Sequence, residues 1–285
     1  MLKYLKIANI YIKFQYTFND FFTEKINAYE THDLNYEFVE FTVMVQEDIQ
    51  VPSREITFTY KNRFKMETDE DCYLLTKEKD KIKHLIYYSK GYKQVKIILN
   101  QYLKDKLPEL EYILSGMYFF EIAISQGYLP IHASALHHKG QTFLLSGPSK
   151  SGKSTHTNLF LEEYPNTIII NEDKPIIFLK ENQLFISGSP WSGKHVINKN
   201  LTYPLDYIFF IKQADKLSIE SLDGFDKVKE LFRNIHRPGD ESLMNQSINI
   251  VNEIIKNIPL YRFKTINNKS SSIYLNQFLE DSHEN

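Results

Sequence analysis

The sequence predicts an α/β protein in which a larger domain with a mixed sheet follows a smaller, β-rich α+β domain. Residues 1–105 are rich in Ile, Val, Phe, Tyr and Thr with partial alternation, as in half-buried strands. A strand–loop–helix pattern occupies residues 141–161, and hairpin patterns lie beside it, which an all-parallel sheet would not contain. A length of 285 residues suits two domains, and we expect them at 1–105 and 106–285.

The overall composition is that of an ordinary globular protein, with 42% hydrophobic and 25% charged residues. A formal charge of −2 supplies no general basic field, so neither nucleic acid nor an anionic membrane is expected as a partner. The single cysteine, Cys72, excludes an intrachain disulfide and fits a reducing compartment. Lysines interrupt the first apolar residues, and no apolar run approaches the roughly 18 residues of a membrane span. A cytoplasmic protein is therefore expected.

In the first region, residues 5–16, 36–46 and 55–60 are the clearest strand segments, and the mixed-charge segment 77–81 is predicted to be a solvated turn or helix end. The region carries no group of residues with an evident chemical role. Substrate binding, oligomerisation and simple coverage of a sheet all remain open for it.

In the second region, apolar residues at helical spacing predict a helix over 110–126, and Gly127 can end it. Strands over 130–137 and 141–146 form the first predicted hairpin. A helix over 153–161 and a β-branched strand over 167–171 follow. The remaining predicted strands are 174–179 and 183–187, which form a second hairpin, 207–212, 217–221 and 260–265, and the remaining predicted helices are 225–235, 242–255 and 271–279.

The loop after strand 141–146 matches the pattern G-x-x-x-x-G-K-[ST]. It reads Gly147-Pro148-Ser149-Lys150-Ser151-Gly152-Lys153-Ser154-Thr155. The strand before it and the helix after it are the context that a P-loop needs, because the loop amides and the helix dipole then face a polyphosphate. The motif predicts binding of ATP or another nucleoside triphosphate, with Lys153 at the β- and γ-phosphates and Ser154 on Mg²⁺. The alternative is a flexible Gly/Ser/Lys linker.

Two adjacent acids, Glu172 and Asp173, end the strand that follows the loop helix. A metal bound to phosphates needs a carboxylate at the end of a neighbouring strand, and a second carboxylate can accept the proton of an attacking hydroxyl. We therefore expect this pair to share the metal and base roles. The alternative is an acidic turn at a strand end.

An ordered set of segments resembles a known family. The segments are Ile131-His132-Ala133-Ser134-Ala135, the hairpin into the P-loop, Asn171-Glu172-Asp173-Lys174-Pro175, and Gly188-Ser189-Pro190-Trp191-Ser192-Gly193-Lys194. Together they resemble the kinases related to HPr kinase/phosphorylase, which share their nucleotide-binding core with the phosphoenolpyruvate carboxykinases. The resemblance covers roughly residues 110–280. It implies a P-loop kinase core of the HPr kinase / PEP carboxykinase type and a kinase that acts on serine or another hydroxyl.

The resemblance also implies roles for particular residues. His132 takes the position of an active-site histidine, Glu172 that of the catalytic base, and Asp173 that of a magnesium ligand. The family commonly has aspartate where this chain has Glu172, so the base is either Glu172 or His132. Lys150 stands where relatives often have glycine, and it lies either near the phosphates or in solvent. The full signature of true HPr kinase/phosphorylases is absent, so HPr is not implied as the substrate.

Other residues admit both a functional and a structural interpretation. Lys194 could hold an anionic substrate or the transferring phosphoryl group, or be a solvated loop charge. Trp191 lies either in the site or in the core. The pair at His137 and His138 lacks a third ligand at metal spacing, and Arg237 either assists the transition state or lies in a solvated turn between helices.

The expectation is thus a kinase that transfers the γ-phosphoryl group of ATP, with Mg²⁺, to a peptide or protein serine or to a small hydroxyl compound. The catalytic residues expected are Glu172, His132, Lys153 and Lys194. One alternative is an accessory protein of a peptide-maturation system, in which ATP only switches conformation. A carboxykinase-like decarboxylation is disfavoured by the short chain. Homo-oligomers remain open.

Overall fold

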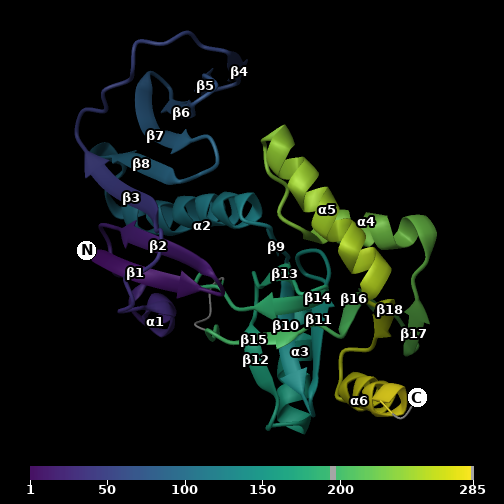
Figure 1. Cartoon of the computed structure of the whole chain (residues 1–285). Coiled ribbons are helices and arrows are strands. Elements are labelled where there is room, and N and C mark those ends of the chain that lie inside the picture. The colour runs from purple at the N-terminus through teal and green to yellow at the C-terminus, as the bar shows by residue number, and fades with distance from the viewer. Residues whose placement is uncertain (193–196, 284–285) are drawn as a thin grey trace. The chain divides into compact units, whose positions relative to one another are not determined.

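The computed structural model describes residues 1–192 and 197–283, so Lys194 lies outside the described residues. The chain divides into two compact units, Met1–Gln126 and Gly127–Asn285. Each unit has its own sheet and helices (Figure 1).

The first unit is built on one eight-stranded sheet. In spatial order its strands are β1 (Leu2–Ile7), β2 (Ile10–Gln15), β3 (Val39–Gln46), β8 (Gln94–Asn100), β7 (Lys81–Ser89), β6 (Asp71–Glu78), β5 (Arg63–Glu67) and β4 (Phe58–Tyr60). The pairs β2–β3 and β3–β8 are parallel and the others antiparallel. The predicted strand over 5–16 is in fact the β1–β2 hairpin. The segment 77–81 comprises the end of β6, the two-residue turn at 79–80 and the first residue of β7.

Helix α2 (Leu107–Ser125) belongs to this first unit, together with α1 (Thr23–Ile26), η1 (Asn27–Tyr29) and η2 (Gln101–Lys106). It packs on β8, and its fully buried Glu111 accepts hydrogen bonds of 2.7 Å from the backbone amides of Thr17 and Phe18. Burial raises the pKa of Glu111, although these two bonds oppose the shift. The unit boundary therefore falls after this helix, whereas the sequence pattern placed it at 105/106.

The second unit contains a mixed six-stranded sheet and a four-stranded antiparallel sheet. The larger sheet runs β12 (Ile168–Asn171), β10 (Ala133–His138), β11 (Gln141–Ser146), β16 (Tyr207–Gln213), β18 (Leu260–Thr265) and β17 (Ser218–Ser221). The smaller sheet runs β15 (Thr202–Pro204), β14 (Gln183–Ser187), β13 (Ile176–Lys180) and β9 (Tyr128–Pro130). Its helices are α3 (Lys153–Glu163), α4 (Gly224–Asn234), α5 (Glu241–Asn257) and α6 (Ser270–His283). The expected mixed sheet of an α/β protein is confirmed.

The larger sheet of this unit is buried on both faces, as its apolar strands require. Phe143 and Leu145 of β11 point into a core with Phe160 of α3 and Leu275 of α6, while Leu144 between them joins a second core under α4, α5 and the smaller sheet. The alternation follows from the two-residue period of a strand. The sheet therefore supplies a rigid, two-sided support for the loops at its ends.

Both predicted hairpins of this unit are present. Lys139 and Gly140 connect β10 to β11, and Glu181 and Asn182 connect β13 to β14, all with positive φ between 46° and 83°. Two consecutive positive φ values are the signature of the tight turns whose twist matches antiparallel strands. The predicted strand 130–137, however, is divided between β9 and β10, and His132 lies at the break.

Candidate active site

The predicted site residues gather at one edge of the six-stranded sheet. Strand β10 lies between β12 and β11 and is antiparallel to both, so β12 and β11 run in the same direction and end at the same edge. Strand β16 is parallel to β11 and ends there too, while β10 begins there. The loop after β11, the acids after β12 and His132 before β10 thus meet at the edge where α/β sheets commonly bind their ligands.

The conformation of the loop 147–155 depends on its two glycines. Gly147 has φ +154°, and a Cβ there would meet Ser151 Oγ at 2.7 Å. Gly152, with φ +98°, ends the loop and directly precedes α3. Lys150 also has a positive φ, +68°, a conformation that glycine adopts more easily than lysine does.

Lys153 lies in the loop and not in solvent. Its side-chain ammonium donates hydrogen bonds to the carbonyl oxygens of Gly147 at 2.8 Å and Pro148 at 3.2 Å, and the residue is only 8% exposed. Burial lowers the pKa of Lys153; the charge of Asp173 opposes this shift and that of Lys174 adds to it. Two of the three donors of the ammonium are thus taken up by loop carbonyls.

Asp173 contacts the histidine predicted for the site. Its Oδ1 lies 3.2 Å from Nε2 of His132, and both side chains are about one-third exposed or less. Burial alone would raise the pKa of Asp173, but the hydrogen bond from His132 and the charges of Lys174 and Lys153 outweigh it and hold that pKa below its usual value. Asp173 is thus kept as a carboxylate beside two lysines.

Glu172 is more deeply buried than Asp173. It is 7% exposed, and its Oε2 has no hydrogen-bond partner among the described residues. Its own carbonyl oxygen accepts a hydrogen bond from Ser134 Oγ at 3.1 Å. A buried carboxylate oxygen without a donor is unfavourable, so this atom is available to bind a cation.

A pocket of about 530 Å³ joins these elements. Of the predicted residues it is lined by Ser149, Lys150, Gly152, Lys153, Ser154, Thr155, His132, Glu172 and Asp173. Gly147, Pro148 and Ser151 form the loop behind this lining. Ser192 and Gln213 also line the pocket, although sequence reasoning did not assign them to the site. Gln213 ends β16, and only the order of strands in the sheet brings it there.

The remaining candidates among the described residues do not line the pocket. Trp191 is 3% exposed, in agreement with a core position. His137 contacts Thr142 Oγ1 at 2.9 Å, and His138 contacts both Asn276 and Thr167. Arg237 is exposed and does not line the pocket.

The donor set around the pocket fits Mg²⁺ bound together with phosphates. Within residues 1–192 and 197–283 no cluster of three His, Cys, Asp or Glu side chains could hold a metal alone. Mg²⁺ is commonly held by one or two carboxylates, with phosphate and water oxygens completing its shell. Asp173, Glu172 with its unpartnered oxygen, and the hydroxyl of Ser154 would supply the protein ligands.

Comparisons with known proteins give only a distant likeness. No protein-family model matches the chain, and no curated protein matches it. Among solved structures, the chain is similar to the HPr(Ser) kinase/phosphatase from Coxiella burnetii, with 12% sequence identity and a TM-score of 0.32 over 54% of this chain and 98% of that one. A likeness this distant carries no argument about activity. Within the described residues, no helix combines the length and apolar character that a bilayer crossing requires.

Proposed function

We propose that this chain is an ATP- and Mg²⁺-dependent kinase that transfers the γ-phosphoryl group to a hydroxyl of a peptide, a protein serine or a small molecule. The observation that carries the proposal is the single pocket lined by Lys153 and Ser154 on one side and by Glu172 and Asp173 on the other. Cations and loop amides suit the binding of a metal-bound polyphosphate. Carboxylates beside them can bind the metal and accept the proton of the attacking hydroxyl.

The amides of the loop 147–155 and the ammonium of Lys153 would hold the phosphates, and Lys153 would exchange its bonds to the loop carbonyls for bonds to phosphate oxygens. Bound Mg²⁺ would neutralise charge on the β- and γ-phosphates. The acceptor oxygen would form a bond to the γ-phosphorus while the bond to the β–γ bridging oxygen breaks and ADP leaves. The hydroxyl proton would pass to Glu172, or to His132 beside Asp173.

The test is transfer of labelled γ-phosphate to a panel of serine peptides, free serine and sugars. Lys153→Ala should abolish product, because Lys153 holds the motif position whose ammonium contacts the β- and γ-phosphates. It should lower the free energy of unfolding by about 1–3 kcal/mol, since two loop carbonyls lose a buried or half-buried donor.

Lys269→Ala is the matched control, because that lysine is exposed and lies outside the pocket. It should leave transfer unchanged. Wild-type rates in Lys153→Ala would contradict the proposal. Mg²⁺-dependent nucleotide binding with no phosphorylated product from any acceptor would instead favour a nucleotide switch.

A further inference from the structure

The first unit carries a pocket that the proposed kinase chemistry does not use. It measures about 410 Å³, within the range of small-ligand sites. One wall is the loop between β3 and β4, at Gln50, Val51 and Pro52, and the opposite side is formed by β6, β7 and β8. We call this pocket the strap groove, and the segment 47–57 the strap.

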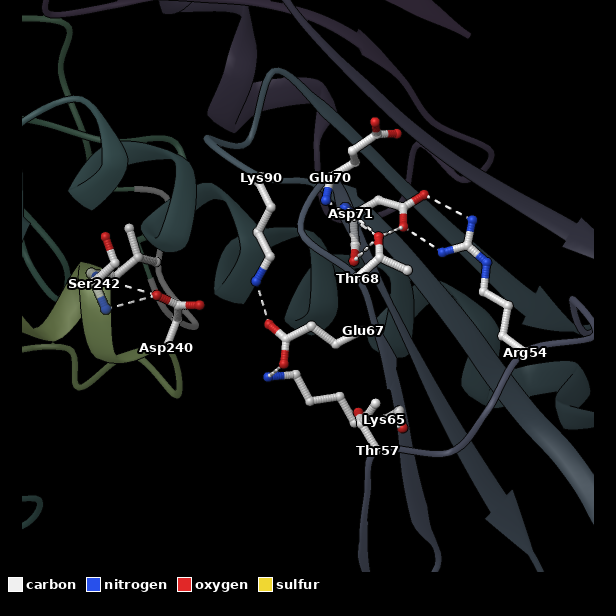
Figure 2. A network of polar contacts seen from close by, with 11 residues as sticks. Arg54, Thr57, Lys65, Glu67, Thr68, Glu70, Asp71, Lys90, Asp240 and Ser242 are labelled. Atoms are coloured by element: carbon white, nitrogen blue, oxygen red, sulfur yellow. Dashed lines mark hydrogen bonds and ion pairs between the residues drawn. The ribbon is translucent and has the colours of Figure 1, made fainter.

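The strap is fastened to the sheet at two points. Ile49, 3% exposed, is packed in the core with Leu85 and Ile98. Further on, both terminal guanidinium nitrogens of Arg54 contact the carboxylate of Asp71, as Figure 2 shows. The Cζ atom of Arg54 lies 4.9 Å from the ring centre of Tyr73. These two contacts, five residues apart, hold the strap residues between them over the sheet. The strap therefore forms a fixed wall of the groove.

The groove has an apolar floor and one charged side chain. Leu85 and Ile98 form the floor, while Tyr73, Tyr87 and Lys96 lie opposite one another across neighbouring strands. The rings of Tyr73 and Tyr87 are 5.0 Å apart. Among the described residues no carboxylate lies within ion-pair distance of the ammonium of Lys96. The groove therefore offers apolar contact beside a positive charge without a counter-ion.

We propose that the strap groove binds an extended peptide segment that carries an apolar side chain next to a carboxylate. The apolar residue lies on Leu85 and Ile98, and the carboxylate pairs with Lys96. The side-chain amides of Gln50 and Gln94 each supply a hydrogen-bond donor and an acceptor. The backbone of a peptide needs both kinds of partner, whereas a simple acyl chain needs neither. This proposal stands independently of the kinase proposal.

The test is titration of the ¹⁵N-labelled full chain with N-acetyl-leucyl-glutamate, followed by amide chemical shifts. A probe of this size should bind with a Kd on the order of 1 mM, with saturable shifts at Val51, Tyr87 and Lys96. N-acetyl-leucyl-glutamine, which lacks the side-chain charge, should bind several-fold more weakly. Absence of saturable shifts at the groove would overturn the proposal.

Two substitutions at the groove and one outside it sharpen the test. Lys96→Glu should weaken the glutamate probe at least about tenfold by reversing the charge. Val51→Glu places a negative charge, like that of the probe, on the exposed strap without altering the core. It should weaken binding of the glutamate probe to a similar extent. Lys79→Glu makes the same charge change as Lys96→Glu in the β6–β7 turn, outside the groove, and should bind as the wild type does.

Unchanged affinity in both groove variants would overturn the proposal. Tighter binding of octanoate than of the dipeptide would assign the groove to acyl chains instead of peptides. Concentration-dependent shifts at the groove without any probe would assign it to a second copy of the chain. None of these results depends on phosphotransfer, so they leave the kinase proposal to its own test.

Discussion

Asn171 holds the acid pair in place. It is fully buried, its Oδ1 accepts hydrogen bonds from the amides of Asp173 and Lys174, and its Nδ2 donates to the carbonyl of Ser189 at 2.9 Å. Ser189 in turn donates to the carbonyl of Lys174. One side chain thus fixes the turn after β12 and ties it to the segment after β14. Asn171 is a positioning residue, because it reaches the proposed chemistry only through its neighbours.

Asn171→Ala should therefore lower kcat more than it weakens nucleotide binding. It removes two acceptor contacts and one donor contact, and the buried groups left behind cost roughly 1–3 kcal/mol each before relaxation. A displacement of the acids near 1 Å would reduce transfer about a hundredfold. Steady-state kinetics with a separate nucleotide Kd would measure the split. Asn257→Ala, an exposed change at the end of α5, is the control. Equal losses in kcat and nucleotide affinity would contradict a positioning role.

At the scale of elements, the loop 147–155 was the most predictable part of the site. Its pattern is local in sequence, and the glycines needed for its positive φ values can be recognised from the residues alone. Gln213 was missed because its place depends on the pairing of β16 with strands distant in sequence. Ser192 was missed because it lies in the segment after β14, outside any strand or helix whose place a pattern could predict. The burial of Lys153 was missed for a related reason, since a motif specifies a residue but not the partners of its side chain.

The loop should tolerate a side chain less well than an ordinary turn does. Gly147→Ala places a Cβ 2.7 Å from Ser151 Oγ, whereas Gly140→Ala in the β10–β11 turn, with φ +83°, meets nothing within 4 Å. Both substitutions cost about 1–2 kcal/mol of backbone strain, but only Gly147→Ala must also displace the loop. We expect Gly147→Ala to lose nucleotide binding by calorimetry and Gly140→Ala to retain it. Similar binding in both variants would show that the loop adjusts freely.

Strand β7 carries a histidine that should make the first unit sensitive to acid. His84 is 9% exposed, its Nδ1 has no partner among the described residues, and burial lowers its pKa to about 4. Between about pH 6.5 and pH 4, His84 binds a proton in the unfolded chain but not in the folded chain. The contribution of neutral His84 to the free energy of unfolding is therefore complete above this range and is lost as the pH falls through it. The loss is on the order of 3 kcal/mol by pH 4.

His84→Leu should remove that part of the acid loss. Urea unfolding followed by circular dichroism from about pH 7.5 to about pH 4.5 would measure the difference between variant and wild type. Other groups titrate in both proteins and cancel in this difference. The exposed His32, replaced in the same way, is the control for the loss of a histidine. An identical slope in His84→Leu and wild type would mean that His84 takes up its proton in the folded state as readily as in the unfolded state.

At the scale of the whole molecule, the sequence predicted two regions with separate sheets, but the division between them follows contacts that sequence periodicity does not contain. Helix α2 has the pattern of an amphipathic helix, and that pattern does not say which sheet it covers. The bonds from Glu111 to residues 17 and 18 connect positions more than 90 residues apart in the chain and keep the helix with the first unit. Long-range pairing of this kind, more than local propensity, decides domain boundaries.

The proposed nucleotide site lies wholly within the second unit, since every residue lining the pocket falls in Gly127–Asn285. A ligand stabilises only the structure that its binding requires, by RT ln(1 + [L]/Kd), or about 2.7 kcal/mol at a hundredfold excess over Kd. Hydrogen exchange of the full chain with Mg²⁺ and a non-hydrolysable ATP analogue should therefore slow in the loop 147–155 and around 171–174. Exchange in β1–β8 should stay unchanged, because unit-specific opening does not involve the site. Slower exchange across β1–β8 would show instead that the nucleotide couples the two units, and the first unit would then take part in the response to ATP.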